Sequence, residues 1–438
     1  MGKTIDRIVT PRTILVAGWA WFLVYAFPGY MSYDSVWQLI QARHIAPINE
    51  WQPPMMVMIW RVLDHVVAGP FLMLVLQSGG FAIGLYAITR RLLPDRAAAI
   101  VTIAMLLLPQ NIIVMGVIWK DAQMAGFLFA AIAALLSPKR GWRVLGYVLL
   151  FFATSVRYNA AAATLPIVLA LFAMRADRGR WKHYALATAA WLGITASALA
   201  ADNMLVEEKV YPWQTSSAPL DIVGIIRYSH KIDEAHLAEE TAGVPWLHAD
   251  KLQIRARMHY QADGNFLTIT DGPNALIQYP TTGAQRDAIA AAWKRLIVEH
   301  PFAFLRHRLG VFDALLTQYA GVWSGFVNAQ WAIDDLDYKT SHSAVQAAWV
   351  GVMETLANTP LFCGWVYFIV GIVLLPLCRR DRIAGILIAS GLLYELGLFL
   401  VTPALDYRYV HWMIVATIAA AIRLFVIRYR QGALRSNR

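Results

Sequence analysis

The chain has 438 residues, of which 58% are hydrophobic and only 15% are charged, and its mean hydropathy is +0.48. Soluble globular proteins carry about 25% charged residues. The composition therefore excludes an ordinary soluble protein and predicts a membrane protein. The formal net charge of +10 reflects membrane topology, as shown below, and gives no reason to expect a nucleic-acid partner.

Ten apolar segments are candidate membrane spans. They cover residues 13–30, 69–89, 97–116, 122–137, 144–156, 159–174, 184–201, 361–378, 383–402 and 409–427. Two of them, 144–156 and 159–174, are shorter than the roughly 20 residues that a helix needs to cross a bilayer. No small-residue cleavage site follows the first segment, which favours an uncleaved helix over a signal peptide. The predicted fold class is an all-α multi-pass membrane protein.

Basic residues concentrate in the connections of one face. These connections hold 21 basic residues against four acids, whereas the rest of the chain holds 17 basic and 24 acidic residues. They cover residues 1–12, 90–96, 139–143, 175–182, 379–382 and 423–438. The positive-inside rule makes this face cytoplasmic and places both termini there.

The opposite, external face receives every connection with chemically interesting residues. In this topology it holds 31–68, 109–121, 157–158, 202–360 and 403–408. The first of these is predicted to contain an interfacial helix that starts at two consecutive prolines. The segment 202–360 is long enough for a small soluble domain, and its apolar periodicity predicts an amphipathic helix and then a second helix along the membrane surface. The chain is thus divided into residues 1–201, 202–360 and 361–438.

Charged side chains at the external ends of the apolar segments are the candidate functional residues. Asp34 follows the first segment, where a carboxylate could accept the proton of an attacking hydroxyl. A plain loop acid is the alternative. Lys120 and Asp121 lie between two apolar runs, where charges are costly and usually functional or paired. Lys120 could bind a phosphate while Asp121 orients it or holds a metal ion, or the two could form a pair at the membrane interface.

Two arginines occupy the remaining external turns. Arg157 and Arg408 could each bind a phosphate through bidentate hydrogen bonds. The alternatives are an interface anchor for Arg157 and a local ion pair with Asp406 for Arg408. Glu395 lies inside the ninth apolar segment, where a hydrogen-bonded structural role is favoured over a site role. His44 fits acceptor binding or a solvated loop position.

Acids and cations on one face of a helical bundle suit transfer from a lipid-linked phosphate. Cations would hold the phosphate, and acids would manage the proton of the acceptor. Such a donor enters from the bilayer and requires no nucleotide-binding fold. The sequence agrees, because it contains neither a Walker A nor a G-x-G-x-x-G motif.

Five short motifs follow one another in the order of a known family. They lie at residues 28–35, 50–54, 118–121, 157–159 and 406–409. Together they resemble the polytopic GT-C glycosyltransferases, and within that class a bacterial family related to the mannosyltransferase and aminoarabinose-transferase groups. The resemblance implies a GT-C-like bundle of about ten transmembrane helices with interfacial helices and a periplasmic, mainly helical insert. It also implies a polyprenyl-phosphate sugar donor and an active site at the external membrane surface.

Nine residues are candidates for the site. They are Asp34 and Asp121 for catalysis, Lys120, Arg157 and Arg408 for the donor phosphate, and Tyr33, Glu50, Asn159 and Asp406 in support. The resemblance implies a catalytic acid in the first external loop, which matches Asp34, whereas a solvated loop position is the alternative for Glu50. The expected protein is a glycosyltransferase of the bacterial inner membrane that acts on a periplasmic glycan or lipid acceptor. Its metal ligands are unknown, no cofactor is certain, and a divalent cation is an option.

One departure from the family pattern concerns Gln52. The family usually reads Asp-Trp-His-Pro-Pro where residues 50–54 read Glu-Trp-Gln-Pro-Pro. Glutamine can neither carry a proton nor bind a metal ion as histidine can. A catalytically inactive assembly factor is therefore kept as an alternative function. A lipid or solute transporter or flippase, with Glu395 and the arginines lining a pathway, is the other alternative.

Overall fold

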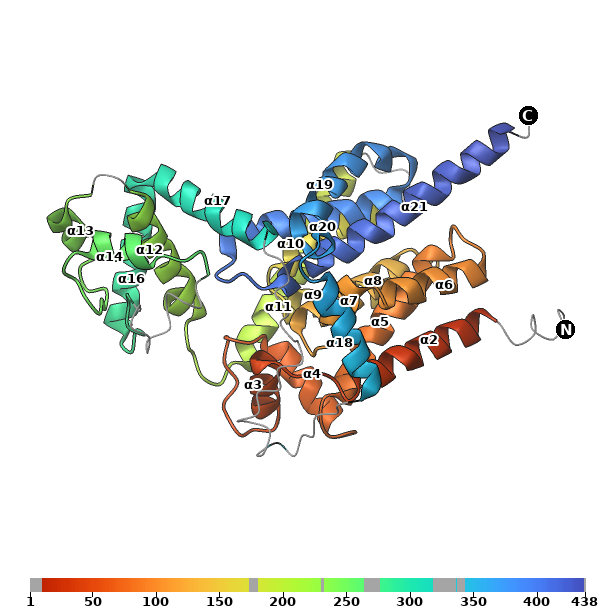
Figure 1. The fold of residues 1–438 in the computed structure, drawn as a ribbon, viewed down its shortest axis with the longest axis horizontal. Helices are drawn as coiled ribbons and strands as arrows, with labels where there is room; N and C mark the ends of the chain where they lie inside the picture. Colours follow the sequence, from red (N-terminus) through yellow and green to blue (C-terminus); the bar gives the residue numbers. More distant parts are fainter. Residues whose placement is uncertain are drawn as a thin grey trace. The chain divides into compact units, whose positions relative to one another are not determined.

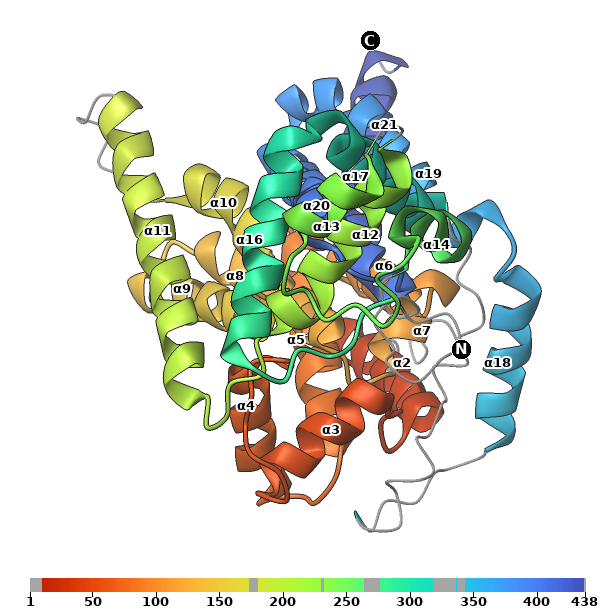
Figure 2. The same ribbon diagram turned by 90° about the vertical axis from the view of Figure 1, so that its left-hand side faces the viewer.

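The computed structural model describes residues 10–172, 180–229, 232–263, 276–317, 336 and 343–436. Within these residues all regular secondary structure is helical, and β-pairing is limited to three isolated bridges. The all-α prediction is confirmed. The chain forms two compact units (Figures 1 and 2). The first comprises residues 1–208, 319–395 and 407–438, and the second comprises residues 209–318 and 396–406.

The first unit contains the helices that correspond to the ten predicted apolar segments. Its helices are α2 (Pro11–Ala26), α3 (Tyr33–Ala42), α4 (Pro54–Asp64), α5 (Phe71–Thr89), α6 (Asp95–Leu106), α7 (Pro109–Met115), α8 (Lys120–Leu135), α9 (Arg140–Val156), α10 (Ala160–Leu171), α11 (Arg180–Leu205), α18 (Ala344–Leu356), η4 (Pro360–Phe362), α19 (Gly364–Leu374), η5 (Leu375–Arg380), α20 (Arg382–Val401), η6 (Tyr407–Val410) and α21 (His411–Ser436). Each apolar segment overlaps at least one of them. Helix α4 also begins where the consecutive prolines predicted it, because proline is well suited to the first position of a helix.

Helices α5, α8 and α9 form the centre of the first unit. Helix α8 packs against both of the others, and Figure 2 shows α8 and α9 side by side. Its contact with α5 depends on glycine, because a Cβ atom on Gly84 would collide with the backbone of Phe129 and Ala130. This close approach sets the spacing between α5 and α8, and Lys120 and Asp121 lie at the start of α8.

Fewer helices than the ten expected are long enough and apolar enough to cross a membrane. Among the described residues, four helical stretches qualify: Phe71–Thr89, Arg180–Leu205, Arg382–Val401 and Tyr407–Gly432. The bent pair α6 and α7, with an angle of 68°, would make a fifth. Helices α8 and α10 have 16 and 12 residues, or roughly 24 and 18 Å, against a hydrocarbon core of about 30 Å. The chain is thus a multi-pass membrane protein by its apolar helices, and the count of ten is not confirmed.

The second unit is a small helical domain around an apolar core. Its elements are η1 (Trp213–Ser217), α12 (Ala218–Tyr228), α13 (Glu234–Glu240), α14 (Leu252–His259), α16 (Gly283–Glu299) and α17 (Pro301–Thr317). Helix α16 contains the predicted amphipathic helix and begins with a capping box at Thr282. Helix α17 also forms, but His307 and Arg308 are buried and turn towards Asp221 at 3.1 and 2.7 Å.

The borders of the second unit differ from the expected insert at 202–360. Helix α18 lies within that range but belongs to the first unit, where Gln346 donates a hydrogen bond to the Phe27 carbonyl oxygen at 3.0 Å. Residues 396–406 join the second unit instead. The physical reason is a buried contact, in which Arg308 donates to the Thr402 carbonyl oxygen at 2.9 Å.

Candidate functional site

The segments that precede α3 and α8 are hydrogen-bonded to each other, and this brings the starts of the two helices together. Tyr30 donates its backbone N–H to the Gly116 carbonyl oxygen at 3.0 Å and accepts from the Ile118 N–H at 2.9 Å. The Ser35 hydroxyl adds a hydrogen bond to the Ile118 carbonyl oxygen at 2.7 Å. Because these contacts join the two segments next to the helix starts, Asp34 comes to lie beside the first turn of α8.

Asp34 is ion-paired with Arg408 and bridged to Lys120. The distance from Arg408 Nη2 to Asp34 Oδ2 is 2.7 Å. Gln52 Nε2 donates to Asp34 Oδ1 at 2.9 Å, and Lys120 Nζ donates to Gln52 Oε1 at 3.3 Å. Burial alone would raise the pKa of Asp34, but the charges of Arg408 and Lys120 outweigh it and lower the pKa to about 2.

Asp121 forms the second acid position of the same cluster. It is fully buried, and its Oδ1 lies 3.1 Å from Arg157 Nε. The Tyr394 hydroxyl accepts from Arg157 Nε at 3.1 Å, and Arg408 Nε lies 3.9 Å from Asp121 Oδ2. Asp121 is in the first turn of α8, where the helix dipole also favours a negative charge. Arg408 therefore connects the two acids into one network.

Aromatic rings hold the two arginines in place. The guanidinium carbon of Arg157 lies 4.5 Å from the centre of the Tyr409 ring. That of Arg408 lies 5.0 Å from the Trp119 ring and 5.5 Å from the Tyr409 ring. Cation–π contacts of this kind contribute about 0.5–2 kcal/mol each. They restrict the arginine side chains to the orientation in which they meet the acids.

The sequence interpretation missed four residues of this network: Gln52 as a bridge, Trp119, Tyr394 and Tyr409. The three aromatic residues each adjoin a charged residue that the sequence did single out, and this proximity is the signal that was available. Gln52 was read as a departure that put activity in doubt. The structure shows it buried, with Asp34 and Lys120 as its partners. The amide of Gln52 provides a hydrogen-bond donor and an acceptor at this position, as the two ring nitrogens of a neutral histidine also would.

Four of the predicted residues lie at the margin of the cluster or outside it. Tyr33 begins α3 and is 57% exposed. Asn159 precedes α10 and is partly buried. His44 is exposed and has a left-handed φ of 60° after the end of α3. Asp406 belongs to the second unit. The local alternative expected Arg408 to pair within its own turn, but Arg408 also pairs with Asp34.

Glu50 belongs to a second acidic group next to the Arg157 turn. Burial raises the pKa of Tyr158, and the negative charges of Asp202 and Glu50 raise it further, which requires all three side chains to be close. Asp202 Oδ1 also accepts the Met55 backbone N–H at 2.9 Å. Glu50 is therefore associated with the start of α4 and the end of α11.

Glu395 is fully buried, and within the described structure neither of its carboxylate oxygens makes a hydrogen bond. The neighbouring Tyr394 accepts a hydrogen bond from Arg157 Nε. The hydrogen-bonded structural role of Glu395 stays a prediction, and Glu395 is a buried acid next in sequence to a member of the network.

The acids of the network are engaged by arginines. In the described part of the chain, a grouping of three or more metal-ligating side chains occurs at His236, Glu240 and Glu299, in the second unit, and not around Asp34 and Asp121. The candidate site thus consists of side-chain cations and acids. Such a set can bind an anionic phosphate and exchange a proton.

Comparison with known proteins gives a distant structural similarity. No protein-family model matches the sequence, and no curated protein matches it. The structure is similar to a crystal structure of ArnT from Cupriavidus metallidurans bound to undecaprenyl phosphate, with 16% identity, a TM-score of 0.37, and coverage of 93% of this chain and 77% of that chain. It is also similar to the apo state of the same ArnT, with 15% identity, a TM-score of 0.36, and coverage of 93% and 76%. Values of this size do not transfer the roles of individual residues.

Proposed function

We propose that the chain is a membrane glycosyltransferase that moves a sugar from a polyprenyl-phosphate donor to an acceptor hydroxyl. The observation that carries the proposal is the network in which Arg408 joins Asp34 to Asp121, at 2.7 and 3.9 Å. It combines a cationic phosphate-binding group with a carboxylate next to it. These are the two functions that the reaction needs in one place.

The charges of the network fit the donor. Lys120, Arg157 and Arg408 supply three positive charges, and Asp34 and Asp121 supply two negative ones, which leaves a net charge of +1. A polyprenyl-phosphate sugar is a phosphodiester with a charge of −1, so its binding would neutralise the network. Buried charges need such compensation because their desolvation is expensive. A neutral lipid without phosphate would leave the surplus charge unpaired.

The proposed reaction preserves this balance. The acceptor oxygen attacks the anomeric carbon, the bond from that carbon to the phosphate oxygen breaks, and the acceptor proton passes to Asp34. The phosphate leaves as a monoester with one more negative charge, while protonation of Asp34 raises the charge of the network from +1 to +2. Lys120, Arg157 and Arg408 would thus stabilise the charge that develops on the leaving group, which is how such cations accelerate transfer.

Asp34 becomes a competent base only when the donor is bound. With a pKa of about 2, set by Arg408 and Lys120 against the effect of burial, its carboxylate is a weak base. A phosphate that takes over Arg408 would remove this counter-charge and raise the pKa of Asp34 towards the range useful for proton transfer. Asp121 keeps Arg157 ordered meanwhile through their 3.1 Å contact.

The location and partners follow from the charge distribution of the sequence. The site residues lie in connections predicted to be external, so the proposed enzyme sits in the bacterial inner membrane with its active site on the periplasmic side. The acceptor would be a glycan or lipid of the cell envelope. Glu50, Tyr33, Asn159 and Asp406 are proposed as supporting residues.

The test compares cells with and without the gene by mass spectrometry of their surface glycans and lipids. The expected result is a sugar-sized mass difference that the wild-type gene restores and Asp34→Asn does not, at equal protein level. Glu354→Gln is the matched control, because Glu354 is an exposed acid on α18, and it should restore the difference. Full restoration by Asp34→Asn would refute the role of Asp34.

The alternative of a transporter or flippase has one supporting feature, the buried Glu395. A transporter would move a labelled polyprenyl-phosphate lipid across vesicles that contain the purified chain, without forming a glycosylated product. An inactive assembly factor would do neither. The same vesicles, supplied with donor and an extract of envelope lipids, therefore distinguish the three functions.

A further inference from the structure

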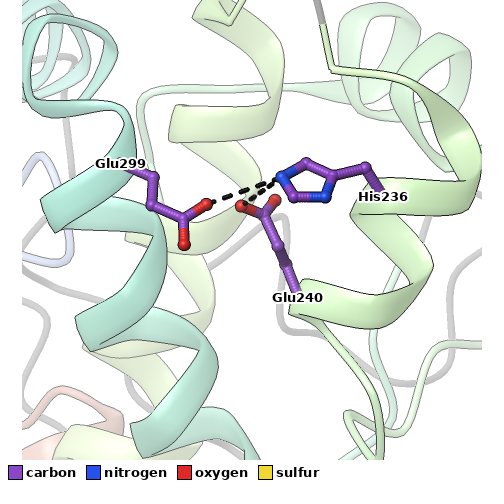
Figure 3. A group of neighbouring side chains, drawn as sticks. All are labelled: His236, Glu240 and Glu299. Atoms are coloured by element: carbon purple, nitrogen blue, oxygen red, sulfur yellow. Dashed lines mark ion pairs between the residues drawn. The ribbon is translucent and has the colours of Figure 1, made fainter.

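A second cluster of charged side chains lies in the second unit, where α13 meets the end of α16. His236 and Glu240 are four residues apart on α13 and share one face of the helix, and Glu299 is the last residue of α16 (Figure 3). One ligating atom from each lies within 4.8 Å of the others. His300 follows Glu299 directly, and its Nε2 lies 3.7 Å from Glu240 Oε1.

The distances within the cluster are those of a metal coordination shell. His236 Nε2 lies 3.3 Å from Glu240 Oε1 and 3.6 Å from Glu299 Oε2. Bonds from zinc to imidazole nitrogen and carboxylate oxygen measure about 2.0–2.2 Å, and two such ligands at a tetrahedral angle are then about 3.4 Å apart. The observed separations surround this value, so one ion could contact all three atoms after small side-chain movements.

The burial of Glu240 is a second observation that fits a bound cation. Its side chain is only 2% exposed, and its Oε1 meets His236 and His300 at 3.3 and 3.7 Å, but neither of its oxygens makes a hydrogen bond in the described structure. The Nε2 atom of His300 is buried without a hydrogen bond as well. A buried carboxylate with no hydrogen bond is costly, and a bound cation is one of the standard ways to compensate it.

We propose that His236, Glu240 and Glu299 bind a divalent transition-metal ion. One neutral imidazole and two carboxylates carry a charge of −2, which a divalent ion neutralises. Nitrogen and oxygen ligands together favour Zn²⁺ over Ca²⁺ and Mg²⁺, which prefer oxygen alone. Because α13 has only seven residues, the ion would fasten it to the longer α16. This metal site is independent of the proposed glycosyl transfer.

Arg295 is a further cation on α16. Its Nη1 atom donates to the Glu239 carbonyl oxygen at 3.2 Å, so the guanidinium contacts the backbone of α13. This hydrogen bond links α13 to α16 and does not depend on the metal, which makes the metal-free protein suitable for study.

The experiment measures zinc binding to the full chain, purified in detergent with a tag that contains no histidine. Metal is removed with EDTA and dialysis, Zn²⁺ is titrated by calorimetry, and retained zinc is counted by elemental mass spectrometry. The wild-type chain should bind one Zn²⁺. His236→Ala and Glu240→Gln should weaken binding at least about 100-fold, because even partners outside the coordination shell contribute 10–100-fold.

Two matched controls separate the cluster from general effects of charge. Glu239→Gln makes the same change at the next, exposed position of α13, and His248→Ala removes an exposed histidine of the same unit. Both should retain wild-type zinc affinity. Zinc should also raise the melting temperature of the wild-type chain but not of His236→Ala, and without zinc Glu240→Gln should melt no lower than wild type. Failure of the wild-type chain to bind zinc, or equal affinity in all variants, would overturn the proposal and identify simple histidine–carboxylate ion pairs.

Discussion

Replacing Arg408 with methionine should raise the pKa of Asp34 into a range that can be measured. In the wild-type chain, burial favours the protonated acid, and Arg408 provides the largest opposing effect. The difference between the ordinary pKa of 3.8 and about 2 corresponds to about 2 kcal/mol of net interaction. Without Arg408, burial is opposed only by Lys120 and Gln52. We therefore expect a pKa of about 4 or higher in Arg408→Met.

The direction of the pH effect follows from this change. Asp34 of the wild-type chain stays ionised down to about pH 2, so its favourable interaction is complete above pH 3.8 and is lost only as the pH falls through about 2. In Arg408→Met the carboxyl group should become protonated as the pH falls from about 5 to about 4, because its pKa is raised to about 4 or higher. The two proteins thus differ most between about pH 4 and pH 5.

Carbodiimide labelling measures this difference without an activity assay, because carbodiimides react with protonated carboxyl groups. Mass spectrometry of the peptide that contains Asp34 should show labelling that increases below pH 5 in Arg408→Met and stays at background in the wild type. Arg90→Met is the control for loss of a cation, since Arg90 is exposed and pairs with Asp95 at 3.6 Å. Identical profiles for wild type and Arg408→Met would refute the view that Arg408 holds Asp34 ionised.

Three further predictions concern stability and packing. Arg157→Leu leaves Asp121 buried without its partner at 3.1 Å, so it should cost about 3–5 kcal/mol, and adding Asp121→Asn should recover part of the loss of melting temperature in detergent. Gln52→Leu removes a hydrogen bond to an ionised carboxylate worth about 1.5–3 kcal/mol, which should lower transfer about 10- to 100-fold in the glycan assay. Gly84→Val should reduce the yield of folded protein by forcing α5 and α8 apart, whereas Gly193→Ala, which meets no neighbouring atom within 4 Å, should be tolerated.

Local structure could be predicted from the sequence because it depends on local patterns. Long apolar runs are helical whatever their neighbours, and each of the ten segments contains helix. The expected amphipathic helix lies within α16, which begins with a capping box at Thr282. The number of membrane crossings could not be obtained in this way. It depends on bends such as the 68° angle between α6 and α7, which hydropathy does not record.

The sequence singled out the charged members of the network but neither their pairings nor their polar and aromatic partners. Topology places Asp34, Asp121, Arg157 and Arg408 on one face, because charged residues at the ends of apolar helices reach the same surface. Which acid meets which arginine is decided by backbone contacts such as that between Tyr30 and Gly116. A sequence read in isolation favours the nearest partner in the chain. Arg408 also pairs with Asp34, which is far away in the sequence, at 2.7 Å.

Residue type alone also misjudged one position. Glutamine at position 52 suggested a lost function, because a side chain was considered without its partners. Between Asp34 and Lys120, an amide that donates to one and accepts from the other is well suited. In the second unit, His236 and Glu240 are four residues apart on one helix, but Glu299 lies on another helix, and the sequence alone does not bring the three together.

The network around Arg408 has a consequence for the order of events in the proposed reaction. As long as Arg408 is paired with Asp34 at 2.7 Å, the carboxylate is too weak a base to accept the acceptor proton. The donor phosphate competes with Asp34 for the same guanidinium, so its binding both neutralises the site and releases the base. Deprotonation of the acceptor then requires a bound donor, and an acceptor that arrives first finds an inactive site. Arg408, rather than Asp34 alone, would thus couple donor binding to catalysis.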